Sequence, residues 1–208
     1  MDLQTVIDEI KNWDNILVLS HASPDGDTIG SAAAMVYAFQ KMGKKVKFDC
    51  ADDLPKKFEY MFTNIEKQDF KEDKIIAVDI AAPVMLGGIK EKYLGKIDLA
   101  IDHHLGHTNL AEMEFVDSNC AANTEIIYKV IDGMGVDIDE NIADCIYTGL
   151  STDTGCFRYR NVTAYTHEIA AKVILAGAKA ADINKLMFET KTKGQLNSEI
   201  ACLSSIEY

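Results

Sequence analysis

The sequence has little that would support a cross-linked or membrane-embedded protein. Its five cysteines are scattered and odd in number and include no C-x-x-C pair, which argues against a disulfide framework or a zinc ribbon. We expect all five to be small buried thiols. Its longest apolar runs fall far short of the roughly 18 residues of a membrane-spanning helix, and the first residues do not resemble a signal peptide. We therefore expect a cytoplasmic protein with no membrane partner.

Positive charge is also scarce. The chain has 21 Lys and Arg against 33 Asp and Glu, which gives a net charge of −12. Non-specific binding to long nucleic acid depends on many contacts between basic side chains and phosphates, so this composition argues against a grip on long nucleic acid. The phosphate-binding patterns G-x-G-x-x-G and G-x-x-x-x-G-K-[ST] are absent as well. A phosphorylated substrate would therefore carry few phosphates and be held by other means.

The sequence does contain an alternation of strand and helix patterns. Hydrophobic residues make up 48% of the chain, as expected for a protein with a sizeable core. Short apolar runs predict strands at 16–19, 45–49, 75–78 and 97–101. Helical spacing predicts helices at 2–13, 28–42, 55–61, 122–133, 140–150, 164–176 and 180–189, with a loop at 151–157. This alternation, without hairpin dipeptides, predicts an α/β fold: a mostly parallel sheet with helices on both faces.

Candidate metal ligands follow three of the predicted strands and one predicted helix. They are His21, Asp25, Asp27, Asp79, the triplet Asp102-His103-His104, and Asp153. Because the carboxyl ends of parallel strands share one edge of a sheet, these distant residues can converge there. Each alone is more often a helix cap or a packing residue. Their shared placement, with three of only five histidines in the motifs, favours a common site.

The ligand types indicate which metal such a site would take. Carboxylates and imidazoles without a thiolate favour a hard or borderline cation, with Mn²⁺ preferred and Mg²⁺, Fe²⁺ or Co²⁺ as alternatives. Four carboxylates balance the charge of two divalent ions. Two ions roughly 3.5–4 Å apart would clamp a phosphoryl group and activate water for attack on it. The residues therefore predict a two-metal site for phosphate chemistry.

These four motifs, in this order, resemble those of the DHH phosphoesterase family, named for the triplet that stands here as Asp102-His103-His104. The segments Ser-His-x-Ser-Pro-Asp-Gly-Asp and Thr-Asp-Thr-Gly-x-Phe resemble one branch in particular. That branch contains nanoRNases (oligoribonucleases), 3′-phosphoadenosine-5′-phosphate phosphatases and linear dinucleotide phosphodiesterases. The resemblance runs from about residue 12 to residue 190 and implies a DHH-type catalytic domain.

The resemblance also implies a role for each motif residue. One Mn²⁺ would be held by His21, Asp25 and Asp79. The second would share Asp79 and be held by the set Asp27, Asp79, His103 and Asp153. His104 would contact the scissile phosphate, and Asp102 would orient a histidine. Replacing Asp27 or Asp153 by alanine is then expected to abolish Mn²⁺-dependent hydrolysis and leave the fold intact.

Three further residues have open interpretations. Arg158 and Arg160 are the only arginines, and in an extended segment over 157–160 they would project to the same side. Their guanidinium groups suit phosphate oxygens, so they either bind substrate or form a solvated rim. His107 could reach the mouth of the site, but the sequence favours a surface position.

The last residues suggest an attachment point. We expect a DHH catalytic domain over 1–190, with 191–208 starting a linker helix to a substrate-binding domain whose Gly-rich, His-containing motif is missing from the sequence. Apolar residues form a stripe that is typical of a docking face, and a homodimer is one of its explanations: Leu196, Ile200, Leu203 and Ile206. A catalytic domain alone would bind metal yet turn over slowly, because positioning contacts are lost.

Three functions remain open at this point. The first is a Mn²⁺-dependent phosphoesterase for short oligonucleotides or nucleoside bisphosphates. The second is an inorganic pyrophosphatase or exopolyphosphatase of the same superfamily. The third is a non-catalytic nucleotide-binding module whose acidic residues cap helices, which would not bind Mn²⁺.

Overall fold

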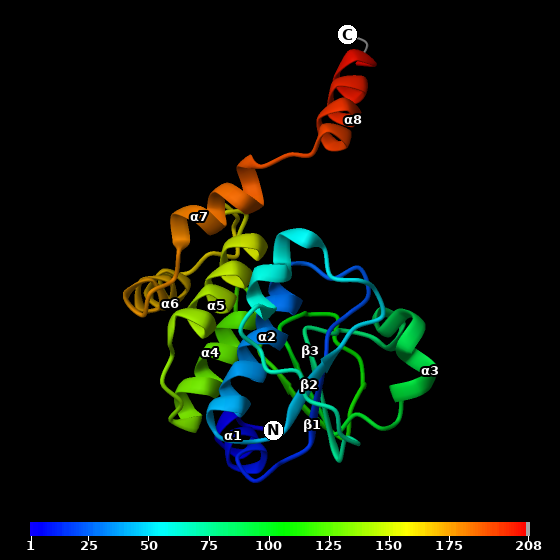
Figure 1. Ribbon diagram of the computed structural model, residues 1–208, viewed down its shortest axis with the longest axis vertical. Coiled ribbons are helices and arrows are strands. Elements are labelled where there is room, and N and C mark those ends of the chain that lie inside the picture. Colours follow the sequence, from blue (N-terminus) through cyan, green and yellow to red (C-terminus); the bar gives the residue numbers. More distant parts are fainter. Residues whose placement is uncertain (207–208) are drawn as a thin grey trace.

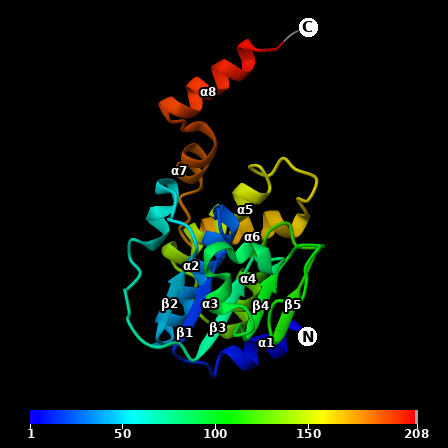
Figure 2. The same cartoon turned by 90° about the vertical axis from the view of Figure 1, so that its right-hand side faces the viewer.

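Five parallel strands form a single sheet in the computed structural model, which describes residues 1–206. The strand order is β2-β1-β3-β4-β5, as labelled in Figure 2, and every neighbouring pair is parallel. The strands are β1 (Ile16–Leu19), β2 (Val46–Asp49), β3 (Lys74–Val78), β4 (Leu99–Asp102) and β5 (Met113–Val116). The predicted parallel sheet is confirmed. All five carboxyl ends therefore lie along one edge.

Burial explains which strands the sequence pattern could reveal. The four residues of β1 and the four of β4 are buried on both faces, as is typical of central parallel strands, and they appear in the sequence as continuous apolar runs. Strand β5 is an edge strand with three half-buried residues and one exposed residue. Its Met-Glu-Phe-Val sequence carries no such run, and it was not predicted.

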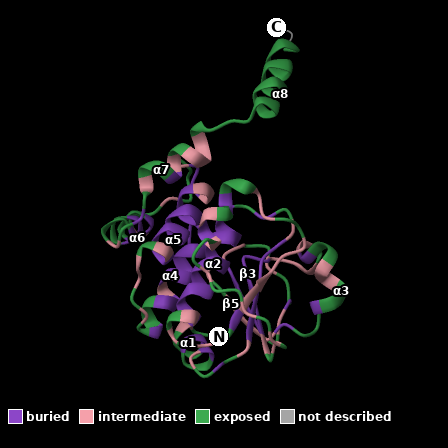
Figure 3. Ribbon diagram, in the orientation of Figure 1, coloured by how far each residue is buried: buried purple, intermediate pink, exposed green. Residues whose placement is uncertain are grey.

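Helices cover both faces of the sheet, as predicted, but unequally. One face packs against α2 (Gly26–Lys41) and α4 (Asn123–Met134). Helix α1 (Leu3–Ile10) packs on α4, and α5 (Glu140–Asp153) packs on both α2 and α4, so that these four helices carry most of the buried core (Figure 3). Helices α2 and α5 can approach closely because Gly30 has no Cβ. A Cβ at this position would overlap the carbonyl oxygen of Cys145. The opposite face is covered by a 3₁₀ helix, Pro83–Ile89, and by α3 (Lys90–Tyr93), through Leu86 and Tyr93.

Several local expectations were wrong. Helix α5 continues to Asp153 through the start of the predicted loop, whereas the helix predicted at 55–61 is present as a 3₁₀ helix, Lys56–Phe62. The C-terminal part forms α6 (Ala164–Leu175), α7 (Ala180–Asn184) with a π-helical turn at Lys185–Glu189, and α8 (Lys193–Ser204). Of the cysteines, only Cys120 and Cys145 are fully buried, and Cys202 is exposed.

Helix α8 extends away from the rest of the chain (Figures 1 and 2). It begins with a capping box between Thr192 and Gln195, and every residue in it is exposed. The apolar side chains of Leu196, Ile200 and Leu203 therefore face solvent. Within residues 1–206, no helix combines the length and apolarity that crossing a membrane requires.

Candidate metal centre

The first motif lies in the connection between β1 and α2. Asp25 caps α2, its Oδ1 accepting hydrogen bonds from the backbone nitrogens of Asp27 and Thr28 at 3.0 and 3.1 Å. His21 Nδ1 lies 2.8 Å from the carbonyl oxygen of Ala22, so its Nε2 is the free ring nitrogen. That Nε2 lies 3.8 Å from Asp25 Oδ1. The strand end and the helix cap thus hold an imidazole and a carboxylate side by side.

Asp79, directly after β3, occupies the middle of the cluster. Its backbone is left-handed, with φ of 58°, a conformation that aspartate tolerates better than most residues and that often marks functional sites. Its side chain is only 3% exposed. Oδ2 lies 3.8 Å from His21 Nε2, and Oδ1 lies 3.5 Å from His103 Nε2. One carboxylate therefore faces a histidine on each side.

His103, directly after β4, connects Asp79 to the helical side of the site. Its Nδ1 is 3.2 Å from the carbonyl oxygen of Cys120, which leaves Nε2 directed at the carboxylates. Nε2 lies 3.7 Å from Asp27 Oδ2 and 3.4 Å from Asp153 Oδ2. Asp153 is the last residue of α5. All six residues predicted to hold metal thus converge at the carboxyl edge of the sheet.

Residues at the start of α4 donate hydrogen bonds to Asp27, a contact that the sequence pattern does not predict. The Asp27 carboxylate is fully buried. Its Oδ2 accepts a hydrogen bond from the backbone nitrogen of Asn123 at 2.5 Å, and its Oδ1 accepts two from Thr124, from the backbone nitrogen at 2.9 Å and from Oγ1 at 2.8 Å. The N-terminus of a helix stabilises negative charge. The only sequence signal was the predicted helix start at 122.

Electrostatics favour a cation at this site. Burial, together with the nearby Asp27 and Asp25 carboxylates, raises the pKa of Asp79 well above its ordinary value. Burial and the same two carboxylates raise the pKa of Asp153 to about 9. Among the described residues, Asp79 Oδ1 and His103 Nε2 are buried without a hydrogen-bond partner. Buried polar atoms normally have partners, and divalent cations would satisfy both atoms and neutralise the carboxylates.

The ligand atoms fall into two groups that match the predicted pair of ions. His21, Asp25 and Asp79 form one, and Asp27, His103 and Asp153 form the other, with the atoms of each group within 4.8 Å of one another. A third, overlapping group adds His104 to Asp79 and His103. Oxygen and imidazole donors of this kind suit Mn²⁺ and related divalent ions. The residues therefore fit the predicted metals.

Asp102 lies beneath the cluster and contacts two histidines. Its Oδ1 is 2.7 Å from His104 Nδ1, and its Oδ2 is 2.7 Å from His107 Nδ1. Burial acts to raise the pKa of Asp102, but the hydrogen bonds from both histidines outweigh it and hold that pKa below its ordinary value. The bond to Asp102 raises the pKa of His104. The His107 side chain is only 7% exposed, so the expected surface position was wrong.

The arginine segment differs from its expected conformation. Gly155, Cys156 and Phe157 are left-handed, and residues 157–160 form turns rather than an extended segment. Arg158 Nε donates to the carbonyl oxygen of Gly155 at 2.6 Å, and both arginines are exposed. The expected alternation of Arg158 and Arg160 along a strand was therefore wrong, and within residues 1–206 neither forms an ion pair.

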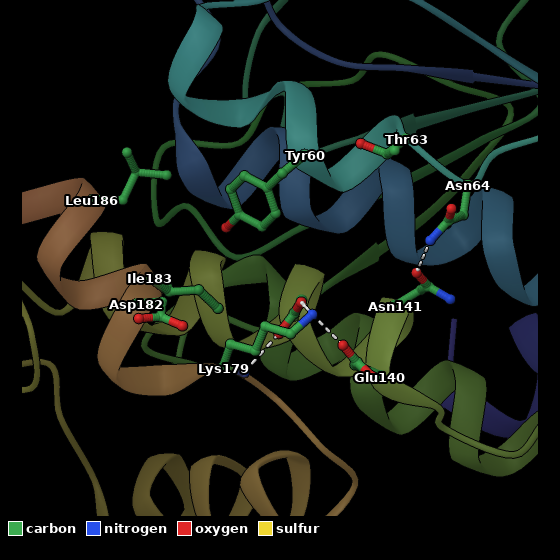
Figure 4. Close-up of a pocket in the computed structure, with 10 residues that line it drawn as sticks. Tyr60, Thr63, Asn64, Glu140, Asn141, Lys179, Asp182, Ile183 and Leu186 are labelled. Carbon is green, nitrogen blue, oxygen red and sulfur yellow. Dashed lines mark hydrogen bonds and ion pairs between the residues drawn. The ribbon is translucent and has the colours of Figure 1, made fainter.

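A pocket of about 480 Å³ lies elsewhere, between the 3₁₀ helix Lys56–Phe62, α5 and α7 (Figure 4). Its walls carry an ion pair between Lys179 and Glu140 and a 2.8 Å hydrogen bond between the side chains of Asn64 and Asn141. Its lining includes none of the six convergent residues. The candidate metal centre is thus defined by its ligands rather than by the depth of a cavity.

Comparison with known proteins agrees with this arrangement. The profile described as "DHH family, N-terminal domain" matches residues 15–150, which is more than half of the chain. The chain belongs to the DHH family. It is 30% identical over 196 residues to the "Bifunctional oligoribonuclease and PAP phosphatase NrnA" of Thermus thermophilus, a match that covers 89% of this chain and 59% of that protein. The chain thus spans somewhat more than half the length of this relative.

Two other proteins are similar to most of this chain. A Streptococcus equi subsp. equi protein named "Probable manganese-dependent inorganic pyrophosphatase" is 26% identical over 211 residues, covering 88% of this chain and 63% of that protein. The crystal structure of an exopolyphosphatase-related protein from Bacteroides fragilis superposes with a TM-score of 0.88 at 24% identity, covering 99% of this chain and 66% of the other. The latter similarity shows the fold alone.

Proposed function

We propose that this chain is the catalytic part, over residues 1–190, of a two-metal phosphoesterase that acts on short oligonucleotides or nucleoside bisphosphates. The single observation that carries the proposal is the position of Asp79 between His21 and His103, with distances of 3.8 and 3.5 Å to their Nε2 atoms. One shared carboxylate between two ligand groups is the arrangement that a pair of adjacent cations needs. The similarity to the oligoribonuclease and PAP phosphatase of Thermus thermophilus supports the substrate class.

The residues of the site have two separate roles, metal binding and phosphate binding. Two Mn²⁺ ions, when bound, would supply Lewis-acid activation of the phosphate and of a water. His21, Asp25 and Asp79 would hold one ion, and Asp27, His103 and Asp153, with Asp79, the other. His104, whose Nδ1 donates to Asp102 and whose pKa that bond raises, would in its protonated form donate from Nε2 to a phosphate oxygen and stabilise its developing charge. The acidic character of the chain fits a substrate with few phosphates.

A substrate panel tests the proposal directly. Purified protein is incubated, with Mn²⁺ or with a chelator, with a ribodinucleotide, with adenosine 3′,5′-bisphosphate and with pyrophosphate. We expect Mn²⁺-dependent release of nucleoside 5′-monophosphate from the dinucleotide or of phosphate from the bisphosphate. Asp153→Asn should lower these rates at least about 100-fold, since a ligand of the metal is lost. Asp182→Asn, an exposed acid in α7, is the matched control and should not change them.

A pyrophosphatase is the second candidate, and the Streptococcus equi similarity favours it. Faster Mn²⁺-dependent cleavage of pyrophosphate than of either nucleotide would select this alternative and reject the proposed substrate class. If no substrate is cleaved and Mn²⁺ does not bind, measured by calorimetry, the phosphoesterase proposal is wrong. The remaining reading is then a nucleotide-binding module.

A further inference from the structure

His107 connects two carboxylates at the base of the site. Its Nδ1 lies 2.7 Å from Asp102 Oδ2, and its Nε2 lies 3.4 Å from Glu114 Oε1. Glu114, on β5, also accepts hydrogen bonds from the backbone nitrogens of Leu110 and Ala111 at 2.6 and 3.3 Å. Neither Asp102 nor Glu114 is among the residues proposed to hold metal. The imidazole is thus hydrogen-bonded to Asp102 on β4 and faces Glu114 on β5, while its Nε2 is buried without a hydrogen-bond partner among residues 1–206.

The loop that carries His107 is exposed at its tip and fixed at its base. Leu105 is 92% exposed, and Gly106 is exposed too. On the other side of His107, the Thr108 backbone nitrogen and Oγ1 donate to the carbonyl oxygen of Ala81 at 2.8 and 3.1 Å. Between the exposed tip and this anchor, the hydrogen bond from His107 Nδ1 to Asp102 Oδ2 holds the buried side chain.

The contact with His107 determines how Asp102 can act on His104. The Asp102 side chain is fully buried, and each of its oxygens has one histidine partner. Without His107, Oδ2 would be a buried charged oxygen without a partner, which is costly, and the carboxylate would be free to rotate about its Cβ–Cγ bond. The His104 ring would then lose its fixed orientation. Outer hydrogen bonds of this kind commonly determine which ring nitrogen of a histidine is available.

We propose that His107 is a positioning residue that fixes Asp102 so that His104 presents Nε2 to the substrate phosphate. The proposal rests on the role given to His104 in the proposed function. It adds a chain of contacts that runs from Glu114 through His107 and Asp102 to His104. His107 itself touches no substrate and no metal in this arrangement.

Two substitutions of His107 distinguish the roles of its two ring nitrogens. His107→Asn can keep an N–H near the position of Nδ1, facing Asp102, whereas His107→Gln places its N–H near the position of Nε2, facing Glu114. We expect His107→Ala and His107→Gln to lower kcat about 10- to 100-fold with KM and Mn²⁺ affinity changed less than about threefold. His107→Asn should recover most of the lost kcat.

The tautomer of His104, observed by NMR, tests the positioning role without an activity measurement. In long-range ¹H–¹⁵N correlation spectra of the metal-free protein, recorded where His104 is neutral, wild type and His107→Asn should show His104 protonated at Nδ1. His107→Ala should show a mixture of the two tautomers. His104→Ala assigns the signals.

Each other result contradicts the proposal. Wild-type kcat in His107→Ala, or a better rescue by Gln than by Asn, would show that the contact with Asp102 does not matter for turnover. A loss of Mn²⁺ affinity equal to the loss of kcat would show a merely structural role. If the wild-type protein cleaves no substrate, the proposed function fails, and the tautomer of His104 in His107→Ala alone decides the positioning role.

Discussion

Asp27 in the first turn of α2 accepts two hydrogen bonds from Thr124 near the start of α4, from the backbone nitrogen at 2.9 Å and from Oγ1 at 2.8 Å. Both donors reach Oδ1, while Oδ2 lies 3.7 Å from His103 Nε2. Burial raises the pKa of Asp27. Because Thr124 stabilises the charged form and fixes the plane of the carboxylate, it prepares Asp27 to act as a ligand.

Thr124→Val therefore tests whether the helix start contributes to metal binding. The substitution removes the Oγ1 donor and nearly conserves the volume. We expect Mn²⁺ affinity to fall about tenfold or more and the free energy of unfolding of the metal-free protein to fall by about 1–3 kcal/mol, since hydrogen bonds to charged groups are strong. Calorimetric titration with Mn²⁺ and urea unfolding in chelator measure the two effects.

Ser31→Ala is the matched control for Thr124→Val. Ser31 is fully buried and accepts a 3.0 Å hydrogen bond from the side chain of Asn123, next to Thr124, yet makes no hydrogen bond to Asp27 within residues 1–206. It should lower stability by a similar amount and leave Mn²⁺ affinity unchanged. Equal losses of Mn²⁺ affinity in both variants would mean that the start of α4 acts only through general stability.

Gly149 in α5 is a second test of the same contact. A Cβ there would lie 2.5 Å from Thr124 Oγ1 and 2.6 Å from Asp27 Oδ1. We expect Gly149→Ala to weaken Mn²⁺ binding and to lower stability by about 1–3 kcal/mol through overpacking, more than the gain in helix propensity of about 1 kcal/mol. In the control Gly133→Ala, the new Cβ meets only the flexible Ile7 side chain, so stability should change little. Wild-type Mn²⁺ affinity in Gly149→Ala would count against the importance of this packing.

The convergence of the site could be predicted because it depends on strand ends. His21, Asp79 and His103 each follow a continuous apolar run, and parallel pairing alone places the ends of those runs together. Asp25 and Asp27 belong to the helix start that follows β1. The local pattern and the topology therefore contain enough information for these positions.

The supporting residues could not be predicted, because they depend on tertiary packing. Thr124 meets Asp27 only because α4 packs beside α2, and His107 lies near Glu114 only because the unpredicted strand β5 pairs with β4. The same limit applies to Arg158, since three left-handed residues turn the chain just before it. No spacing in the sequence reports these arrangements.

Alanine at Asp27 and asparagine at Asp153 should have different effects on the stability of the metal-free protein. Asp27→Ala leaves the buried donors of Asn123 and Thr124 without an acceptor, so the metal-free protein should lose about 1–3 kcal/mol of stability. Asp153, with its pKa raised to about 9, is a neutral carboxyl group at pH 7 in the metal-free protein, so the neutral amide of Asp153→Asn should not destabilise it. Urea unfolding in chelator measures this difference, and equal destabilisation by the two substitutions would contradict it.

Mn²⁺ affinity should rise with pH between about 6 and 9. The pKa of Asp153 is raised to about 9, and that of Asp79 is raised as well, so the metal-free folded protein holds protons that a bound cation must displace. Each displaced proton makes the observed affinity rise about tenfold per pH unit below the raised pKa. Calorimetry in buffers of different ionisation enthalpy counts the released protons. Asp153→Asn should release about one proton fewer, and a pH-independent affinity would contradict the prediction.

The stability of the metal-free protein should fall as the pH rises, because the pKa values of Asp79 and Asp153 are raised in the folded state. A carboxyl group with a raised pKa binds its proton more tightly in the folded state than in the unfolded state. Its contribution to stability is therefore fully present below the unfolded pKa of 3.8 and is lost as the pH rises toward about 9. Thermal unfolding in chelator from pH 5 to pH 9 should show a falling midpoint, and a rising midpoint would contradict this.

Glu125 provides an independent case away from the metal ligands. It lies in the first turn of α4, its side chain is buried, and its Oε1 accepts a 2.6 Å hydrogen bond from Thr166 Oγ1. Burial raises its pKa above 4.5, so its contribution to stability is present below pH 4.5 and is lost as the pH rises through the folded-state pKa. Glu125→Gln cannot titrate. Its stability relative to wild type should therefore increase from pH 4 to pH 8, even if the amide group carries a constant cost at every pH.

Urea unfolding in chelator, carried out on wild type and on Glu125→Gln across this range, measures the change. The metal-ligand carboxylates titrate equally in both proteins, so their contribution cancels in the difference. Glu112→Gln, an exposed acid just before β5, is the control for the loss of one carboxyl group. If the difference in free energy of unfolding between Glu125→Gln and wild type does not change with pH, the Glu125 carboxyl loses its proton at its ordinary pKa, and burial beside Thr166 does not perturb it.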